Sequence, residues 1–204
     1  MTHCIAILIS GRGSNMAALI EASQEPGYPG SIELVLSSHE DAGGLAFARD
    51  AGIEAIAVPR KNFPSKQAFE AAMCEELTKR EISFICLAGF MRVLSDTFVE
   101  GWKDRMLNIH PSLLPLFRGL HVHEQALQAG VAVSGCTVHL VTPELDSGPI
   151  IGQAVVPVLP GDTPDSLAER VQKAEHRLYP AALRRCLEGK ASASPDHQMV
   201  LSLL

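Results

Sequence analysis

The feature that most constrains the fold is an alternation of short apolar runs with helix-like stretches through the first half of the chain. Nearly continuous apolar strands separated by helices are typical of a parallel sheet covered on both faces, because no strand then keeps a face for water. The expected strands are 4–9, 32–36, 53–58, 82–88 and 106–109. The expected helices are 15–22, 45–51, 63–80 and 124–129.

The second half departs from this alternation. Strands are expected at 134–141 and 150–158, and the turn-rich loop between them favours an antiparallel pair. A long helix follows, with Asp162 or Thr163 as N-cap and Pro164 at its first position. We therefore predict an α/β protein with a mostly parallel mixed sheet and helices on both faces. Residues 1–204 are expected to form a single domain, with 190–204 as a loosely held tail.

The charge and the cysteines narrow the function classes. The formal net charge is −6, and an acidic surface repels phosphate backbones and anionic membranes, so we expect no nucleic acid and no membrane as partners. The five cysteines are odd in number, scattered, and without C-x-x-C spacing, which indicates buried thiols in a reducing compartment. With no basic leader at the amino terminus, the expected location is the cytoplasm.

Residues 10–15, Ser-Gly-Arg-Gly-Ser-Asn, lie between a buried strand and a helix start. Glycines allow close backbone approach, and the first N–H groups of a helix favour an anion such as phosphate. A plain tight turn is the competing interpretation. A dinucleotide site is disfavoured because Met16 replaces the third glycine and Glu33 falls inside a strand. No Gly-Lys-Ser/Thr follows, which excludes a Walker loop.

Asn108 and His110 end a short strand, and their spacing points both side chains to one face. An amide can donate to a developing oxyanion while an imidazole moves a proton. Asp146, in the loop between the two later strands, offers a carboxylate that could orient the His110 ring and favour its charged form. Spacing cannot show that the two meet, and a structural role for His110 stays open.

His121, His123 and His139 raise the question of a metal site. A His–His–Asp set is conceivable, but no His-Glu-x-x-His spacing or carboxylate-rich ligand set accompanies them, so we predict no metal. His121 is expected to close the substrate pocket or to cap the helix after it.

Several motifs occur in a fixed order: Ile-Ser-Gly-Arg-Gly-Ser-Asn (9–15), Leu-Ala-Gly-Phe-Met-Arg-Val-Leu (87–94), Asn-Ile-His-Pro-Ser-Leu-Leu-Pro (108–115), Gly-Leu-His (119–121), Glu-Leu-Asp-Ser-Gly-Pro (144–149) and Arg-Val-Gln-Lys-Ala-Glu-His (170–176). Each alone is weak; six in register over nearly the whole chain are specific. In these motifs the chain resembles the phosphoribosylglycinamide formyltransferases, the folate-dependent transformylases of purine synthesis.

The resemblance implies a Rossmann-like formyltransferase fold with the nucleotide substrate in the amino-terminal half, and the folate and catalytic loop in the carboxyl-terminal half. It implies a catalytic set and two groups of binding residues. The catalytic set is Asn108, His110 and Asp146. The substrate-binding group is Gly13, Ser14 and Asn15 at the phosphate with Glu175 at the ribose. The group at the folate is Lys66, Met91, Arg92, Val93, Leu94 and Asn108.

The implied reaction is direct transfer from 10-formyltetrahydrofolate to the glycinamide ribonucleotide amine. Asn108 and protonated His110 would stabilise the tetrahedral oxyanion, and Asp146 would keep His110 charged and help relay the proton. Neither a metal nor a covalent enzyme intermediate is needed. The expected partners are the two small substrates, and the expected assembly is a monomer or a homodimer.

One departure is visible in Leu116-Phe117-Arg118-Gly119, where this family commonly has a proline before the glycine. An arginine there is similar to methionyl-tRNA and sugar formyltransferases. The alternative is therefore formyl transfer to another amine, such as an amino-sugar nucleotide. The length of the chain disfavours the tRNA enzymes and the formyltetrahydrofolate hydrolases, which usually carry an added domain.

Overall fold

The strands of the amino-terminal half pair in parallel, as the apolar runs indicate. The structure, a computed structural model, describes residues 3–191 and 198–203. The chain divides into two units, 1–107 and 108–204. In the first unit the strand order is β3-β2-β1-β4, and every adjacent pair is parallel. These strands are β1 (His3–Ile9), β2 (Gly30–Ser37), β3 (Glu54–Ala57) and β4 (Phe84–Leu87).

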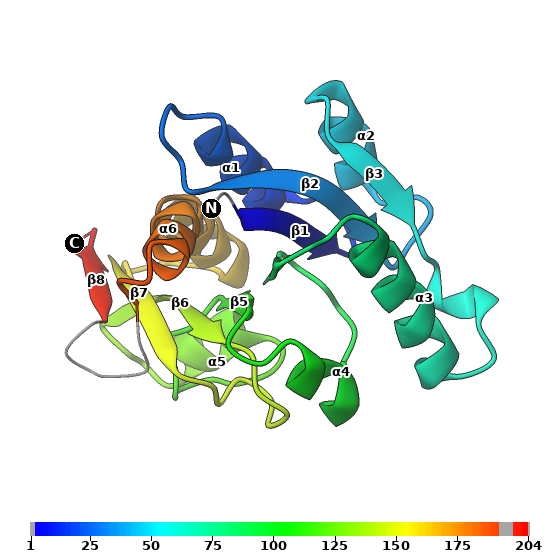
Figure 1. The fold of residues 1–204 in the computed structure, drawn as a ribbon. Coiled ribbons are helices and arrows are strands. Elements are labelled where there is room, and N and C mark those ends of the chain that lie inside the picture. Colours follow the sequence, from blue (N-terminus) through cyan, green and yellow to red (C-terminus); the bar gives the residue numbers. More distant parts are fainter. Residues whose placement is uncertain (1–2, 192–197, 204) are drawn as a thin grey trace. The chain divides into compact units, whose positions relative to one another are not determined.

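Helices cover both faces of the first unit's strands (Figure 1). The chain steps one way from β1 to β3 and then back across to β4. Right-handed crossovers therefore place the helix before β4 opposite the two earlier helices. The helices are α1 (Ser14–Ser23), α2 (Gly43–Asp50), α3 (Lys66–Lys79) and α4 (Asp96–Gly101), with a 3₁₀ turn η1 (Arg60–Asn62).

Helix α3 begins later than predicted. The sequence pattern placed its start at residue 63, but Phe63 is extended, with φ −118° and ψ 138°. Pro64 disfavours a helical conformation in the residue before it. Ser65 then caps the helix by accepting a hydrogen bond from the Ala68 N–H at 3.1 Å. The short helix α4 was not predicted from the sequence; Ser95 caps it in the same way, through the Phe98 N–H.

The second unit contains the antiparallel pair that the turn-rich loop predicted. Strands β6 (Val133–Leu140) and β7 (Ile150–Pro157) pair antiparallel, β8 (Met199–Ser202) adds in parallel to β7, and β5 (Met106–His110) runs into this unit from the first. The helices are α5 (Val122–Gln128) and α6 (Pro164–Leu187). The α/β class and the mostly parallel mixed sheet are thus confirmed.

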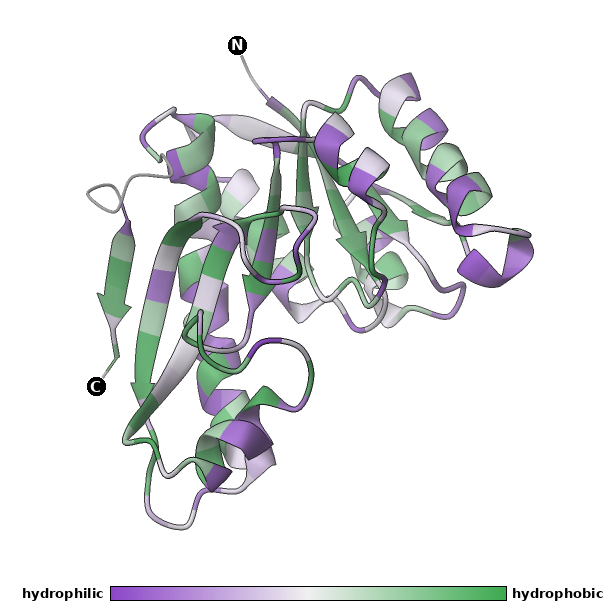
Figure 2. Ribbon diagram, turned by 90° about the horizontal axis from the view of Figure 1, so that it is seen from below, coloured by the Kyte–Doolittle hydropathy of each residue, from purple (hydrophilic) through white to green (hydrophobic). Residues whose placement is uncertain are grey.

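Helix α6 packs against β6 and β7 with the face that its periodicity indicated. The predicted stripe is fully buried: Leu167, Val171, Ala174, Leu178 and Ala182. Thr163 is the N-cap, as one of the two predicted options, and it forms a capping box with Ser166. Figure 2 shows apolar colouring concentrated on the strands and polar colouring on the outer turns of the helices.

The predicted loose tail, 190–204, contains strand β8, so the structure differs from the expectation there. Residues 199–202 pair with β7 from Gly152 to Val155. A run of four residues with half-buried alternation carries too little periodicity to be recognised as a strand. The rest of that prediction, at 192–197 and 204, lies outside the described residues.

The cysteines are all free thiols, and Cys86 and Cys136 are buried. Among the described residues, no helix combines the length and the apolar character that crossing a membrane requires.

Gly135 allows β6 and β7 to approach closely, because a Cβ at this position would lie 1.9 Å from the Ala154 carbonyl oxygen. We expect Gly135→Ala to lower the free energy of unfolding by about 3 kcal/mol, since the obstructing atom belongs to the paired backbone and cannot rotate away. Urea denaturation of the purified variant measures this change.

Gly101→Ala is the matched control, because no atom lies within 4 Å of its added Cβ and its φ is ordinary. The control should stay within about 1 kcal/mol of the parent protein. Equal stability of both variants would contradict the close approach at Gly135.

Candidate active site

Asn108 and His110 project from the same face of strand β5. The alternation of strand side chains puts residues two apart on one face, and His110 is buried while Asn108 is half-buried. Both belong to the second unit. The placement follows directly from their spacing.

Asp146 comes from the loop between β6 and β7, and this loop is shaped to bring the carboxylate inward. Asp146 has a left-handed backbone, with φ 50°, which aspartate tolerates better than most residues. The loop folds tightly onto β6, because a Cβ on Gly148 would lie 1.8 Å from the Leu140 carbonyl oxygen. The Leu140 N–H donates to the Pro149 carbonyl oxygen at 2.9 Å and closes the loop.

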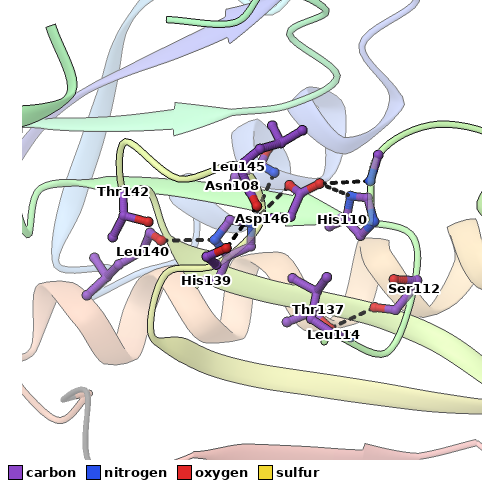
Figure 3. A network of polar contacts seen from close by, with 12 residues as sticks. Asn108, His110, Ser112, Leu114, Thr137, His139, Leu140, Thr142, Leu145 and Asp146 are labelled. Carbon is purple, nitrogen blue, oxygen red and sulfur yellow. Dashed lines mark hydrogen bonds and ion pairs between the residues drawn. The ribbon is translucent and has the colours of Figure 1, made fainter. Parts of the chain in front are cut away.

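The three predicted catalytic side chains lie in one cluster (Figure 3). His110 Nδ1 lies 3.5 Å from Asp146 Oδ2, an ion-pair distance if the ring is protonated. His110 Nε2 lies 2.9 Å from the Phe117 carbonyl oxygen. Asp146 Oδ2 also accepts a hydrogen bond from the Gly119 N–H at 3.1 Å. The structure thus brings Asp146 to His110, which spacing alone could not show.

A fourth polar side chain, His139, belongs to this cluster and was not among the predicted site residues. Its Nε2 lies 3.2 Å from Asn108 Nδ2 and 3.7 Å from Asp146 Oδ1, and its Nδ1 lies 2.9 Å from the Leu140 carbonyl oxygen. Burial is the main cause that lowers the pKa of His139. The sequence signal for this residue is a histidine within an apolar strand.

Thr137 holds the segment that follows β5. Its hydroxyl donates to the Ser112 carbonyl oxygen at 2.7 Å and accepts from the Leu114 N–H and from Gln153 Nε2, each at 3.0 Å. Ser112 in turn donates from its hydroxyl to the Leu116 carbonyl oxygen at 2.6 Å. These bonds fix the segment that presents the Phe117 carbonyl to His110.

His121 and His123 stand at the start of helix α5. His121 occupies the N-cap position of α5 with φ 57°, as one of its two predicted roles, although its side chain makes no capping hydrogen bond. The His121 side chain is largely exposed, and its Nδ1 lies 3.4 Å from Glu124 Oε1. Burial, with the neighbouring His110, lowers the pKa of His123. Across the described residues, no three His, Cys, Asp or Glu side chains gather as metal ligands would.

The predicted phosphate loop lies in the first unit, at the end of β1. Gly13 is the N-cap of α1 with φ 75°, and a Cβ there would come within 3.3 Å of the Gly44 backbone. Ser14 and Asn15 form the first turn of α1, which contains no acidic residue. This is the strand–glycine turn–helix arrangement in which helix N–H groups favour an anion.

The predicted folate segment, Met91, Arg92, Val93 and Leu94, follows β4 in the same unit. Ser10 ties this segment to the phosphate loop, because its hydroxyl accepts from the Met91 N–H at 2.8 Å. The Met91 and Val93 side chains are 67% and 72% exposed, which leaves apolar surface available to a ligand. Lys66 is the first residue of α3.

Glu175 and Arg118 belong to the second unit. Glu175 is buried on α6. Burial, and next the negative charge of Glu175, raise the pKa of the Cys136 thiol, which makes that cysteine a poor nucleophile. Arg118, the departure from the family pattern, forms an exposed ion pair with Glu144 at 3.4 Å.

Comparison with known proteins gives consistent matches. Residues 3–183 match the family model described as "Formyl transferase". The phosphoribosylglycinamide formyltransferase of Escherichia coli (strain K12) is 44% identical over 91% of this chain and 88% of its own length. The human trifunctional purine biosynthetic protein adenosine-3 is 48% identical over 91% of this chain. This chain spans between 14% and 18% of the length of such trifunctional relatives.

Solved structures agree in fold. A phosphoribosylglycinamide formyltransferase from Brucella melitensis superposes with a TM-score of 0.89 at 53% identity, covering 95% of this chain and 100% of that chain. Glycinamide ribonucleotide transformylase 1 from Symbiobacterium toebii gives a TM-score of 0.92 at 44% identity, covering 97% of this chain and 92% of that one.

The lowered pKa of His139 predicts how stability depends on pH. Below the ordinary value of 6.5, the unfolded chain binds a proton that the folded ring does not. The free energy of unfolding should therefore decrease as the pH is lowered below this value. This group contributes a decrease of up to about 1.4 kcal/mol per pH unit, until the folded ring is protonated as well. His123 and His176, whose pKa values burial also lowers, act in the same direction.

The measurement is urea denaturation of the parent protein and of His139→Gln between about pH 7.5 and about pH 5.5. The free energy of unfolding of the variant should depend less steeply on pH. The variant lacks one ring that binds a proton in the unfolded chain but not in the folded protein. Parallel pH dependences in the two proteins would contradict the assignment.

Proposed function

Because this chain belongs to the formyl transferase family, we propose that it transfers the formyl group of 10-formyltetrahydrofolate to the amine of 5-phosphoribosylglycinamide, a step of purine (IMP) biosynthesis. The observation that carries the proposal is the cluster of Asn108 with the buried His110 and Asp146, in which His110 Nδ1 lies 3.5 Å from Asp146 Oδ2. Amide, imidazole and carboxylate are groups that can stabilise an oxyanion and move a proton in an acyl transfer.

In this reaction a bond forms between the amine nitrogen and the formyl carbon, and the bond from that carbon to the folate nitrogen breaks. One proton passes from the attacking nitrogen to the departing nitrogen. Negative charge develops on the formyl oxygen between these steps. The donors in this chain that suit that charge are the Asn108 amide and the His110 ring.

His110 lies between two oxygen acceptors, the Phe117 carbonyl at 2.9 Å from Nε2 and the Asp146 carboxylate at 3.5 Å from Nδ1. A neutral imidazole carries one N–H and can satisfy one of them, whereas the imidazolium satisfies both. Asp146, held in place by the Gly119 N–H, would keep this charge beside the reacting group and assist the proton's transfer.

Substrate binding is assigned to the remaining predicted residues. Gly13, Ser14 and Asn15 would hold the phosphate, which the left-handed Gly13 and the acid-free first turn of α1 support. Glu175 would contact the ribose hydroxyls. Lys66 and the segment of Met91, Arg92, Val93 and Leu94 would bind the folate, which the exposed apolar side chains of that segment support. The partners would be these small molecules, and the protein a cytoplasmic monomer or homodimer.

The direct test mixes purified protein with a 10-formyl folate analogue and glycinamide ribonucleotide in the presence of a chelator, and follows absorbance. Deformylation that depends on the ribonucleotide supports the proposal and shows that no metal is required. Deformylation without it indicates a hydrolase. Transfer to an amino-sugar nucleotide instead would favour the alternative acceptor.

His110→Ala should abolish formyl transfer while leaving the affinity for the folate analogue within about 3-fold, because the ring acts on the transition state. Single-turnover transfer and fluorescence titration of the analogue measure the two effects. Near-normal turnover in His110→Ala would exclude the proposed mechanism.

Asp146→Asn should lower kcat by about 100-fold or more and move the alkaline limb of the pH–rate profile to lower pH, because the imidazolium loses its nearby negative charge. The matched control is Asp165→Asn, an exposed aspartate in the first turn of α6, which should keep the parent profile. An unmoved profile in Asp146→Asn would remove Asp146 from this role.

A further inference from the structure

His139 is a buried imidazole to which the proposed mechanism gives no task. The residue is 2% exposed in strand β6, and its side chain lies within the catalytic cluster in Figure 3. Both of its ring nitrogens are engaged, Nδ1 with the Leu140 carbonyl oxygen at 2.9 Å and Nε2 with Asn108 Nδ2 at 3.2 Å. When one hydrogen bond fixes a buried polar ring, the ring in turn restricts the orientation of the group that is bonded to its other nitrogen.

The two partners determine which nitrogen carries the proton. A carbonyl oxygen only accepts hydrogen bonds, so Nδ1 must be the N–H donor toward Leu140. Burial lowers the pKa of His139 and so opposes a second proton on the ring. A neutral ring with its proton at Nδ1 presents the Nε2 lone pair, and the group that suits this lone pair at 3.2 Å is a donor, the Asn108 amide nitrogen.

This tautomer leaves the Asn108 amide one favourable orientation. Turning the amide by 180° would place its oxygen against the Nε2 lone pair, where two acceptors repel each other. The ring cannot adapt by moving its proton to Nε2, because Nδ1 would then face the Leu140 carbonyl with a lone pair. Adding a second proton is opposed by burial of the ring.

We propose that His139 is a positioning residue that fixes the Asn108 amide with its nitrogen, not its oxygen, available to the formyl oxygen. One N–H of Asn108 Nδ2 is directed to His139, and the second N–H of the same nitrogen is the donor for the developing oxyanion. The inference rests on the proposed function, which it deepens. Without His139, the amide could present its oxygen and would repel the charge that it should stabilise.

The ladder between β6 and β7 is irregular beside His139. Val138 pairs with Gly152 and His139 pairs with Ile150, so the extra residue lies in β7. Such an irregularity increases the local twist of the ladder. The neighbouring carboxylate, Asp146, lies 3.7 Å from Nε2 and 3.5 Å from His110 Nδ1. Because His139 is neutral, His110 is the ring that can act as the cationic partner of Asp146.

The experiment compares two substitutions of similar size. His139→Met removes the acceptor and should lower kcat for transfer to glycinamide ribonucleotide by about 10- to 100-fold, somewhat less than deletion of an oxyanion donor, with both KM values within about 3-fold. His139→Gln supplies a side-chain oxygen that can accept from Asn108 and should recover kcat to within about 5-fold of the parent. Equal losses in both variants would overturn the proposal.

A double-mutant cycle separates positioning from a general structural role. If His139 acts through Asn108, then His139→Met should change kcat by less than about 3-fold in the Asn108→Ala background. A full additional loss in that background would overturn the proposal, because a merely structural contribution is additive.

A measurement on the parent protein does not depend on how the variants fold. Nitrogen-15 NMR of the imidazole rings near neutral pH should show His139 as the neutral Nδ1–H tautomer. The Nε2–H tautomer or an imidazolium would overturn the inference. Absence of ribonucleotide-dependent transfer by the parent protein would instead overturn the proposed function, while the tautomer could still be determined.

Discussion

The carboxylate of Asp146 and the groups that surround it are the interaction on which the rest of the site depends. A buried carboxylate is stable only when charges or hydrogen-bond donors compensate for its lost hydration. Asp146 is 8% exposed, accepts from the Gly119 N–H and lies between the His110 and His139 rings. Each of these partners comes from a different segment, so the carboxylate holds three segments of the second unit together.

Two imidazoles near one carboxylate would normally compete for it. The structure resolves this competition through their second nitrogens. Each second nitrogen faces a backbone carbonyl, Leu140 for His139 and Phe117 for His110. His139 then uses its remaining nitrogen as an acceptor for Asn108, whereas His110 turns its remaining nitrogen to Asp146. In the proposed mechanism the same side-chain type thus has a neutral orienting role in one place and a cationic role in the other.

The glycines and the buried hydroxyl of Thr137 show how backbone geometry serves this arrangement. Gly148 lets the loop of Asp146 lie against Leu140, where no side chain fits. Thr137 binds the backbone of Ser112 and Leu114 and so fixes the segment that leads to Phe117. Rigid support of this kind reduces the reorganisation that charge development would otherwise require.

Apart from the short helix α4 and the strand β8, the sequence by itself determined the order of strands and helices. It also determined the two-residue spacing that places Asn108 and His110 on one face, and the buried stripe of α6. These features are local, since they follow from repeats of two or of 3.6 residues. It also provided the glycine loop before α1, because a strand, a glycine turn and a helix start are adjacent in the chain. The predicted start of α3 was wrong, because Pro64 disfavours a helical conformation in the residue before it.

Only the tertiary structure decided that Asp146 meets His110 and that His139 faces Asn108. Those contacts join residues far apart in the chain, and they depend on strand register, on the register shift between β6 and β7 and on the closure of the β6–β7 loop. None of these features follows from a short-range repeat in the sequence. The tautomer of His139 was equally inaccessible, because it is set by the acceptor and the donor that the fold places on either side of the ring.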